Sequence, residues 1–506
     1  MTLQMHPKYT DAVALAERTV RLRRDAPLSE PAGAVDALQI ATPRGTVILP
    51  GLALGVREAV RSLAREETTE ERLAALVTDV DGETGLLRLH LALRRLDGAG
   101  LIEHGVRVDG QLIAVLRPIG FGPFPPAPAL GEQVKLSRFA MLRAADGLLV
   151  AESPRSHLAV EVASPAAMLI SELAAWSDPA KFRIPGLPEQ AIAEVLRLFA
   201  TAGLLAVGGP DDDAEDAGSA GQWSVHDLWL HARSRGPRLS AGYGGTYHLR
   251  DKFTPLPAAL PAIQSAQRAV TLPQPDLARI MAADPPLTEV IERRRSIREH
   301  DDSAPITSAQ LGELLYRSAR LRRVIPGGDG QELADRPYPA GGSVGELEVY
   351  PLITKCAGLE PGLWHYAADR HGLELVAEPA PMVSALVEAA RSASLMRTDP
   401  QVVLIVTARF GRLTWKYETI AYSLTLKHVG VFYQTVYLVA TAMGLAVCGL
   451  GGGSADDFAQ VSGCDYLAEG SVGEIVIGAA AGGPGQFSTA AGGPDQFSAA
   501  AVRRGG

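Results

Sequence analysis

The sequence has few cysteines and no excess of positive charge. Its three cysteines, Cys356, Cys448 and Cys464, are odd in number and lack the spacing of zinc ligands. This excludes a disulfide framework, and we expect a protein without a metal site in a reducing, cytoplasmic compartment. The formal net charge of -9 at pH 7 argues against a nucleic-acid-binding protein.

The pattern also offers neither a secretory signal nor a membrane span. Residues 1–25 mix charged and apolar side chains without the apolar segment of a signal peptide. Residues 429–455 carry no charge and reach the roughly 20 residues that a spanning helix needs. Polar residues and glycines interrupt this stretch, so we interpret it as a helix buried in a large core or a dimer interface, and we expect no membrane association.

What is present is typical of a globular protein with several domains. The chain has 506 residues, of which 47% are apolar and 21% charged, and this length predicts two to four domains. The first half shows strands followed by helices, twice over. Strands are predicted at 36–50 and 137–163, and helices at 55–65, 69–76, 84–99, 165–175 and 189–202.

This repetition predicts two winged-helix-like modules, residues 1–125 and 126–208. Neither has a basic helix face, and the pair Arg94-Arg95 is the most basic feature of the helices. DNA binding is therefore disfavoured, and a plain scaffold remains open.

The rest of the chain divides into three segments. Residues 209–285 are acidic and then rich in glycine and proline, which predicts a linker and connector. Residues 286–481 predict a compact α+β domain. Residues 482–506 repeat a short phrase of low complexity, to which we assign no chemistry.

A cluster of arginines lies near the start of the α+β domain, after a helix predicted at 287–295. Arg294, Ser296 and Arg298 alternate, so an extended backbone would place them on one side as an anion site, and Arg295 lies among them. The backbone dipole at a helix C-terminus repels anions, so side chains would have to hold the ligand. The alternative is that these arginines only cap the helix.

Two glycine-rich segments follow, and each could bring backbone amides close to a flat ligand. The first comprises Pro339, Ala340, Gly341, Gly342 and Ser343 and runs into a strand. The second lies beyond a long apolar helix predicted at 418–443 and comprises Gly449, Leu450, Gly451 and Gly452. It lacks the Lys-Ser/Thr ending of a P-loop and the strand–glycines–helix order of a dinucleotide fingerprint.

Lys416 and Tyr417 form an unusual pair just before that apolar helix. Removal from water favours the neutral, basic form of a lysine, so the pair could act as a general base. A lysine whose stem packs beside a core tyrosine is the equally weighted alternative.

Taken together, these residues resemble the FMN-dependent nitroreductase fold, in the order arginine cluster, glycine loop and central helix. Within that fold they are most similar to the azoline dehydrogenases of the SagB type. The resemblance rests on four phrases: Arg336-Pro-Tyr-Pro-Ala-Gly-Gly, Glu348-Val-Tyr, Gly362-Leu-Trp-His-Tyr and Lys416-Tyr417.

The resemblance implies oxidation of thiazoline or oxazoline rings in a ribosomally made peptide to thiazoles or oxazoles. It implies FMN as cofactor and a homodimer with the flavin at its interface. It also implies a precursor peptide as substrate, and it leaves a complex with a cyclodehydratase open. Lys416 and Tyr417 would be catalytic. The arginine cluster, both glycine segments and Gln434 of the central helix would bind the cofactor.

The front modules resemble the element by which such enzymes hold a leader peptide, with an extended peptide added to a sheet edge. Some positions depart from the family pattern: Ala340 stands where serine is frequent, and Ser343-Val344-Gly345 where a more polar stretch is usual. Arg503 and Arg504 are the nearest candidates for a further phosphate ligand. Two other functions stay open, an NAD(P)H-dependent nitro- or quinone reductase and a non-catalytic peptide-binding scaffold.

Overall fold

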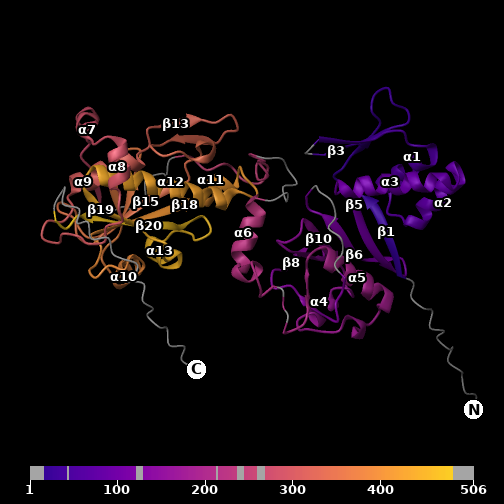
Figure 1. Ribbon diagram of the computed structural model, residues 1–506. Helices are drawn as coiled ribbons and strands as arrows, with labels where there is room; N and C mark the ends of the chain where they lie inside the picture. The colour runs from indigo at the N-terminus through magenta and orange to yellow at the C-terminus, as the bar shows by residue number, and fades with distance from the viewer. Residues whose placement is uncertain are drawn as a thin grey trace, which may run out of the picture. The chain divides into compact units, whose positions relative to one another are not determined.

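The computed structural model describes residues 16–42, 45–120, 129–211, 213, 215–235, 244–258 and 268–482. The chain divides into two units, Met1–Thr246 and Tyr247–Gly506, each of which is described by itself (Figure 1).

The N-terminal unit is built on a six-stranded antiparallel sheet that both predicted modules share. In spatial order its strands are β1 (Ala16–Leu22), β5 (Ile102–Val108), β6 (Gln111–Pro118), β10 (Leu158–Val162), β9 (Leu148–Glu152) and β8 (Met141–Ala145). Strand β6 of the first module pairs with β10 of the second. The two modules are therefore halves of one unit.

Each half confirms the predicted order of strands followed by helices. The first has β2 (Leu28–Ser29), β3 (Leu38–Thr42) and β4 (Gly45–Leu49), then α1 (Leu54–Arg65), α2 (Glu70–Asp81) and α3 (Thr84–Gly98). The second adds α4 (Met168–Glu172), the 3-10 turn η1 (Pro179–Lys181) and α5 (Glu189–Thr201), with β7 (Gln133–Leu136) paired to β11 (Leu205–Gly208). Helix α2 begins where the Thr69 side chain accepts a hydrogen bond from Arg72 N, as expected of an N-cap threonine.

The acidic segment 209–222 is packed against the second half and is not the linker that its composition predicted. Glu215 is 1% exposed and accepts hydrogen bonds from Ser137 Oγ at 2.6 Å and Arg155 Nη1 at 2.7 Å. The short turn η2 (Ala220–Gln222) and helix α6 (Val225–Arg235) follow within the same unit. The acidic composition predicted a chain exposed to solvent. In the structure, however, Ser137 and Arg155 hydrogen-bond to the buried carboxylate of Glu215.

The C-terminal unit has a seven-stranded antiparallel sheet. In spatial order its strands are β12 (Ala269–Thr271), β17 (Gly372–Ala377), β16 (Gly362–Ala367), β15 (Leu347–Ile353), β18 (Val402–Arg409), β20 (Glu469–Ala479) and β19 (Leu445–Gly449). Strands β13 (Arg323–Pro326) and β14 (Glu332–Asp335) form a separate two-stranded hairpin. The helical elements are α7 (Leu277–Ala283), α8 (Leu287–Arg293), α9 (Ser308–Ala319), η3 (Gly341–Ser343), α10 (Pro381–Ser394), α11 (Phe410–Thr414), α12 (Ala421–Ala442) and α13 (Ala455–Ser462).

Both faces of this sheet are covered, which explains the continuous apolar run of β18. Val402, Leu404 and Val406 belong to the core that includes Phe432 of α12. Val403 and Ile405 belong to the opposite core, which α10 and α13 share. The α12 helix thus lies on one face of the sheet (Figure 1), and it is buried on the side that faces the core, whereas its other side is exposed. Within the described residues, none of the helices has the length and apolar character to cross a membrane.

The second glycine segment has a different setting from the one predicted. Helix α12 ends at Ala442, and β19 intervenes before Gly449. The glycines therefore lie between a strand and helix α13, so the strand–glycines–helix order that we excluded is present. However, β19 pairs antiparallel with β20, whereas a dinucleotide-binding unit needs a parallel crossover.

Candidate functional site

The first glycine loop and the Lys-Tyr pair lie against each other, although they are far apart in sequence. Gly342 has a left-handed backbone with φ of 62°. A side chain at this position would place its Cβ 2.6 Å from Tyr417 Oη and 3.2 Å from Lys416 Nζ. Only a glycine lets the loop approach these two functional groups so closely. We call this group of residues the loop cluster.

Aromatic rings surround the lysine of the loop cluster. Lys416 is half-buried, and its Nζ lies 5.6 Å from the ring centroid of Tyr247 and 5.7 Å from that of Tyr417. The backbone N–H of Tyr247 donates to Lys416 O at 3.1 Å, and Trp415 Nε1 donates to Phe253 O at 2.7 Å. The segment 244–258, predicted only as connector, therefore lines the site.

Tyr417 is held in its neutral form. Its side chain is buried, and burial followed by the nearby Glu346 charge raises the pKa of the phenol above its usual value. A neutral phenol can donate a hydrogen bond but cannot accept a proton as a base.

A buried histidine supports the loop from beneath. The N–H of Gly341 donates to His428 Nε2 at 2.7 Å, so the ring proton lies on Nδ1 and donates to Glu346 Oε1 at 2.6 Å. Glu346 is fully buried, and its Oε2 has no hydrogen-bond partner in the described part of the chain. Arg412 is also fully buried and donates to the carbonyl of Val344.

Arg412 acts as a clamp between three chain segments. Besides Val344 it donates to Glu332 O at 2.6 Å and to Leu256 O. Burial lowers the pKa of its guanidinium to about 10, which leaves it charged at neutral pH. Sequence reasoning missed Arg412, His428 and Glu346, because a single buried polar residue within an apolar run carries no spacing signal.

The arginine segment and the second glycine segment form a second group, which we call the arginine cluster. Tyr437 of α12 connects them: its Oη lies 2.8 Å from Ser296 Oγ and accepts from Gly449 N at 2.7 Å. The guanidinium of Arg294 stacks 5.4 Å from the Tyr437 ring centroid. In the described residues Arg294 has no carboxylate partner, so its charge is available to an anion. Arg298 donates through Nε to Ser394 O at 2.8 Å.

Other predicted site residues have different positions. Arg295 donates through Nη1 to Glu292 O and Arg294 O, both at 2.8 Å, and so caps α8 instead of facing an anion. Gln434 lies on the exposed side of α12. A Cβ at Gly451 or Gly452 would meet nothing within 4 Å, which leaves this turn open to a ligand.

The remaining predicted site residues differ in their exposure to solvent. Pro339 and Ser343 are exposed and Ala340 half-buried, whereas Leu450 is buried and donates its N–H to Glu474 O at 2.8 Å. Arg503 and Arg504 lie outside the described residues.

The two clusters lie on opposite sides of α12. His428 supports the loop cluster, and Tyr437 supports the arginine cluster. The two residues are nine positions apart, which is about two and a half turns at 3.6 residues per turn, so their side chains leave the helix on opposite sides. One chain thus presents two half-sites separated by a helix. The residues fit parts of a flavin mononucleotide: Arg294, which has no carboxylate partner within the described residues, fits the phosphate, and the glycine segments allow close approach of a ring.

The other phrases behind the resemblance form a buried polar network. Glu348 Oε1 lies 3.5 Å from Arg336 Nη2, and His365 Nε2 lies 3.5 Å from Glu348 Oε2. Burial would raise the pKa of Glu348, but Arg336, His365 and Arg409 outweigh it and keep the pKa below its usual value. These residues connect β15 and β16 to the segment that precedes the glycine loop, so their role is to support that loop.

Comparison with known proteins places this geometry in a family context. Residues 291–479 match the Nitroreductase family, and residues 134–240 match the family described as cyanobactin oxidase ThcOx. The chain therefore has a C-terminal nitroreductase domain preceded by an N-terminal domain, as predicted. Both matches support an oxidoreductase.

Individual relatives agree with the first match. A nitroreductase-family protein of Methanocaldococcus jannaschii is 28% identical over 165 residues, which are 33% of this chain and 78% of that protein. Among solved structures, a nitroreductase-family protein from Ralstonia eutropha JMP134 shares 24% identity and a TM-score of 0.34, covering 44% of this chain and 94% of that one.

Two further solved structures are also similar to part of this chain. The E. coli microcin synthetase McbBCD complex with truncated pro-MccB17 bound shares 18% identity and a TM-score of 0.32, covering 46% of this chain and 87% of that one. A nitroreductase-family protein in complex with FMN from Exiguobacterium sibiricum shares 14% identity and a TM-score of 0.27, covering 39% and 89%. Members of the Nitroreductase family use FMN as their cofactor.

Proposed function

We propose that this protein is an FMN-dependent azoline dehydrogenase that oxidises thiazoline or oxazoline rings of a ribosomally made peptide to thiazoles or oxazoles. The observation that carries the proposal is the loop cluster, in which Gly342 lies against Lys416 Nζ and Tyr417 Oη. In this proposal Lys416 would serve as the base and Tyr417 as a hydrogen-bond donor beside a loop that a flat ring can approach. The match of residues 134–240 to a cyanobactin oxidase supports a peptide as the substrate.

The chemistry divides between these residues and the cofactor. The azoline Cα–H is acidified by the neighbouring imine and carbonyl, so Lys416 takes this proton while the neutral Tyr417 donates a hydrogen bond that orients the ring. When bound, FMN would supply the two-electron oxidation that removes the hydride from Cβ. Aromatisation of the ring favours the products, and dioxygen serves as the final acceptor.

Cofactor binding is assigned to both clusters. Arg294, Ser296 and Arg298 would hold the phosphate through charge-assisted hydrogen bonds. Glycines 341 and 342 of the first loop and glycines 449–452 of the second segment would border the ring system.

The separation of the two clusters supports a homodimer in which each flavin contacts both subunits. The loop and arginine clusters lie on opposite sides of α12, so a loop cluster would meet the arginine cluster of the other subunit. Between them, α12 presents an exposed row at four-residue spacing: Tyr422, Leu426, Gly430 and Gln434. Two residues of this row, Tyr422 and Leu426, are large hydrophobic side chains that are 48% and 40% exposed, and exposed apolar groups of this kind are common at subunit interfaces.

Mixed dimers test this arrangement. A Lys416→Ala subunit lacks the base, and an Arg294→Gln/Arg298→Gln subunit lacks the phosphate ligands. If each site uses both subunits, the mixed dimer contains one intact site, and activity should return to about half of the wild-type value. If each site lies within one chain, both sites of the mixed dimer are damaged and activity stays absent.

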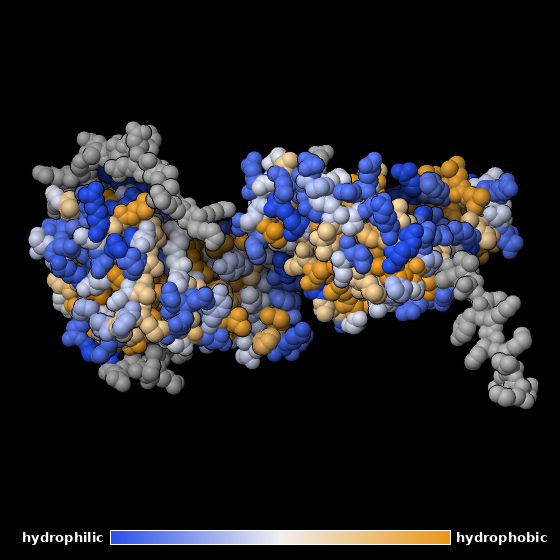
Figure 2. Space-filling view, turned by 90° about the horizontal axis from the view of Figure 1, so that it is seen from below, coloured by the Kyte–Doolittle hydropathy of each residue, from blue (hydrophilic) through white to orange (hydrophobic). Residues whose placement is uncertain are grey.

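We further propose that the first half of the N-terminal unit docks the leader of the precursor peptide along β4. Within the described residues β4 pairs only with β3 in the order β2-β3-β4, so its other edge would offer backbone groups to an extended peptide. Ile48 of β4 is 43% exposed, and Leu87 and Leu91 of α3 are 66% and 58% exposed. The space-filling view shows apolar patches among hydrophilic surface on this unit (Figure 2).

The direct test of function is oxidation of an azoline-containing peptide by the purified, FMN-loaded protein. Mass spectrometry should show the loss of two hydrogens per ring, and Lys416→Ala should retain flavin but stop this loss. Anaerobic mixing with NADPH separates the nitroreductase alternative, because rapid bleaching of the flavin together with no azoline oxidation would favour it. A colourless protein that takes up no FMN would favour a non-catalytic scaffold.

A further inference from the structure

The six-stranded sheet of the N-terminal unit has one helix-covered face and one polar face. Val106, Leu116 and Val160 pack into the core that α5 shares. The opposite face carries charged residues in register, because Arg21 pairs across the sheet with Glu103 and Val115 with Glu161. Such alternation is ordinary for an antiparallel sheet, so the polar face alone assigns no ligand.

Ion pairs fix the side chains on this face. Glu103 is 3% exposed, and its carboxylate lies 2.5 Å from Arg21 Nη2 and 3.1 Å from Arg117 Nε. Arg117 Nη1 also lies 2.9 Å from Glu161 Oε1. Because Glu103 is buried between two guanidiniums, Arg21 and Arg117 are held in place before any ligand arrives.

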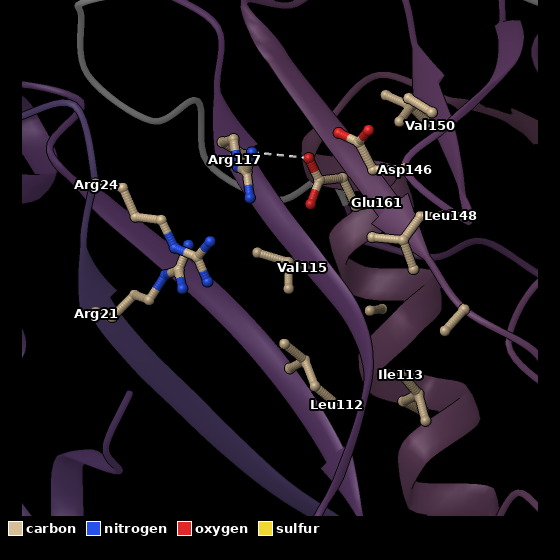
Figure 3. A pocket seen from close by; sticks show the side chains of 13 residues that line it. Arg21, Arg24, Leu112, Ile113, Val115, Arg117, Asp146, Leu148, Val150 and Glu161 are labelled. Atoms are coloured by element: carbon tan, nitrogen blue, oxygen red, sulfur yellow. Dashed lines mark ion pairs between the residues drawn. The ribbon is translucent and has the colours of Figure 1, made fainter. Parts of the chain in front are cut away.

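A cavity of about 260 Å³ opens on this face, and both halves of the unit line it. Its apolar lining includes Leu112 and Val115 of β6 with Leu148 and Val150 of β9. Figure 3 shows Arg21 and Arg24 entering from one side of the pocket and Asp146 lying on the other. The pairing of β6 with β10 creates the pocket, since it brings the two halves together.

Arg24 is the member of this pocket that the fold does not use. It is exposed, and no hydrogen bond or ion pair engages its guanidinium within the described residues. It adds a third guanidinium to Arg21 and Arg117, whose charges Glu103 and Glu161 already balance. An uncompensated guanidinium beside an apolar surface is suited to a carboxylate with an aliphatic neighbour.

We propose that this pocket binds an acidic side chain of the precursor peptide together with the aliphatic side chain beside it. The carboxylate pairs with Arg24 and Arg21, and the aliphatic group packs on Val115 and Leu148. Asp146 on the far side repels a second acidic residue, so the pocket selects one acidic position. The assignment to the precursor peptide rests on the proposed function.

The size of the cavity limits the ligand. Ligand pockets commonly enclose about 300–1,000 Å³, so this cavity of about 260 Å³ lies just below the range and takes about two side chains. It therefore serves as a secondary contact for a peptide that docks elsewhere on the unit. Residues 121–128 have no charged side chain and cannot supply the carboxylate themselves.

Fluorescence anisotropy with the full-length protein tests the pocket. The probes are three labelled peptides, Gly-Ser-Leu-Xaa-Leu-Ser-Gly, in which Xaa is Glu, Gln or Lys. We expect the Glu probe to bind at least about fivefold more tightly than the Gln probe, as one charge-assisted hydrogen bond provides. Arg24→Glu should remove this preference and favour the Lys probe. Arg72→Glu, the same charge change at an exposed position of α2, should preserve it.

The outcomes separate this proposal from the proposed function. Equal affinity of the three probes, no binding, or unchanged selectivity in Arg24→Glu would overturn the pocket assignment. Selective binding by a protein that oxidises no azoline would leave the acidic-peptide site standing and refute the dehydrogenase function. Oxidation of a short azoline peptide without an acidic residue should proceed unchanged in Arg24→Glu.

Discussion

Replacing Gly342 by alanine tests the contact between the glycine loop and the Lys-Tyr pair. The new Cβ would stand 2.6 Å from Tyr417 Oη, which is closer than a Cβ atom approaches other groups, and 3.2 Å from Lys416 Nζ, which is a tight contact. The φ of 62° adds a second cost, because a non-glycine residue in the left-handed region loses about 1–2 kcal/mol. The substitution should therefore destabilise the C-terminal unit and also displace the two reactive groups.

The size of both effects follows from these contacts. We expect the free energy of unfolding to fall by about 2 kcal/mol, which lowers the Tm of a unit of this size by about 4–8 °C. Azoline oxidation should fall further, by about 100-fold, since a misplacement near 1 Å has that effect on a positioned base. Flavin binding through the arginine cluster should persist.

Differential scanning calorimetry and turnover of an azoline peptide measure the two quantities. Gly328→Ala is the matched control, because its Cβ would meet nothing within 4 Å and its backbone is not left-handed. This variant should stay within about 0.5 kcal/mol of wild type. Wild-type stability and turnover in Gly342→Ala would refute the geometry of the loop cluster.

Three further predictions follow from the same structure. The double variant Arg294→Gln/Arg298→Gln should lose the flavin absorbance while its far-ultraviolet circular dichroism spectrum stays unchanged. A double variant that stays yellow would contradict the phosphate assignment. The control is Arg295→Gln, which removes only a helix cap and should stay yellow. Burial lowers the pKa of His300 from 6.5 to about 4. Between pH 6.5 and pH 4 the unfolded state therefore binds a proton that the folded state does not. The free energy of unfolding should fall as the pH falls through this range, by up to about 1.4 kcal/mol per pH unit. Urea unfolding at pH 7 and pH 5 should show this loss in the wild type but not in His300→Gln. An equal change in the free energy of unfolding between the two pH values in both proteins would refute this role of His300. His428→Ala leaves a buried amide and a buried carboxylate without partners, so unfolding in urea should show a loss of about 2–4 kcal/mol, and a loss below 0.5 kcal/mol would contradict the support role.

Local sequence signals were sufficient for much of the fold. Periodic apolar residues predicted the three helices of the first half within a few residues, except that α2 extends to Asp81. Strand β1 was missed because its outward residues are charged, as in Glu17 and Arg21, and only its inward residues alternate as apolar ones. The shared sheet was also missed, since the pairing of β6 with β10 joins strands that no sequence period connects.

The site shows the same division between local and long-range information. Lys416, Tyr417 and Gly342 could be singled out because each has a distinctive local phrase, and the structure brings them together. The residues that hold them, His428 and Arg412, could not, because their roles depend on carbonyl and amide groups brought near by the tertiary fold. The opposite placement of the two clusters likewise required the three-dimensional course of α12.

The most direct test of the account is mass spectrometry of one azoline-containing peptide after incubation with FMN-loaded wild-type protein and with FMN-loaded Lys416→Ala. The account predicts the loss of two hydrogens per ring with wild type and an unchanged peptide mass with the variant. Ring oxidation at the wild-type rate by the flavin-bound variant, or an unchanged mass with both proteins, would contradict it.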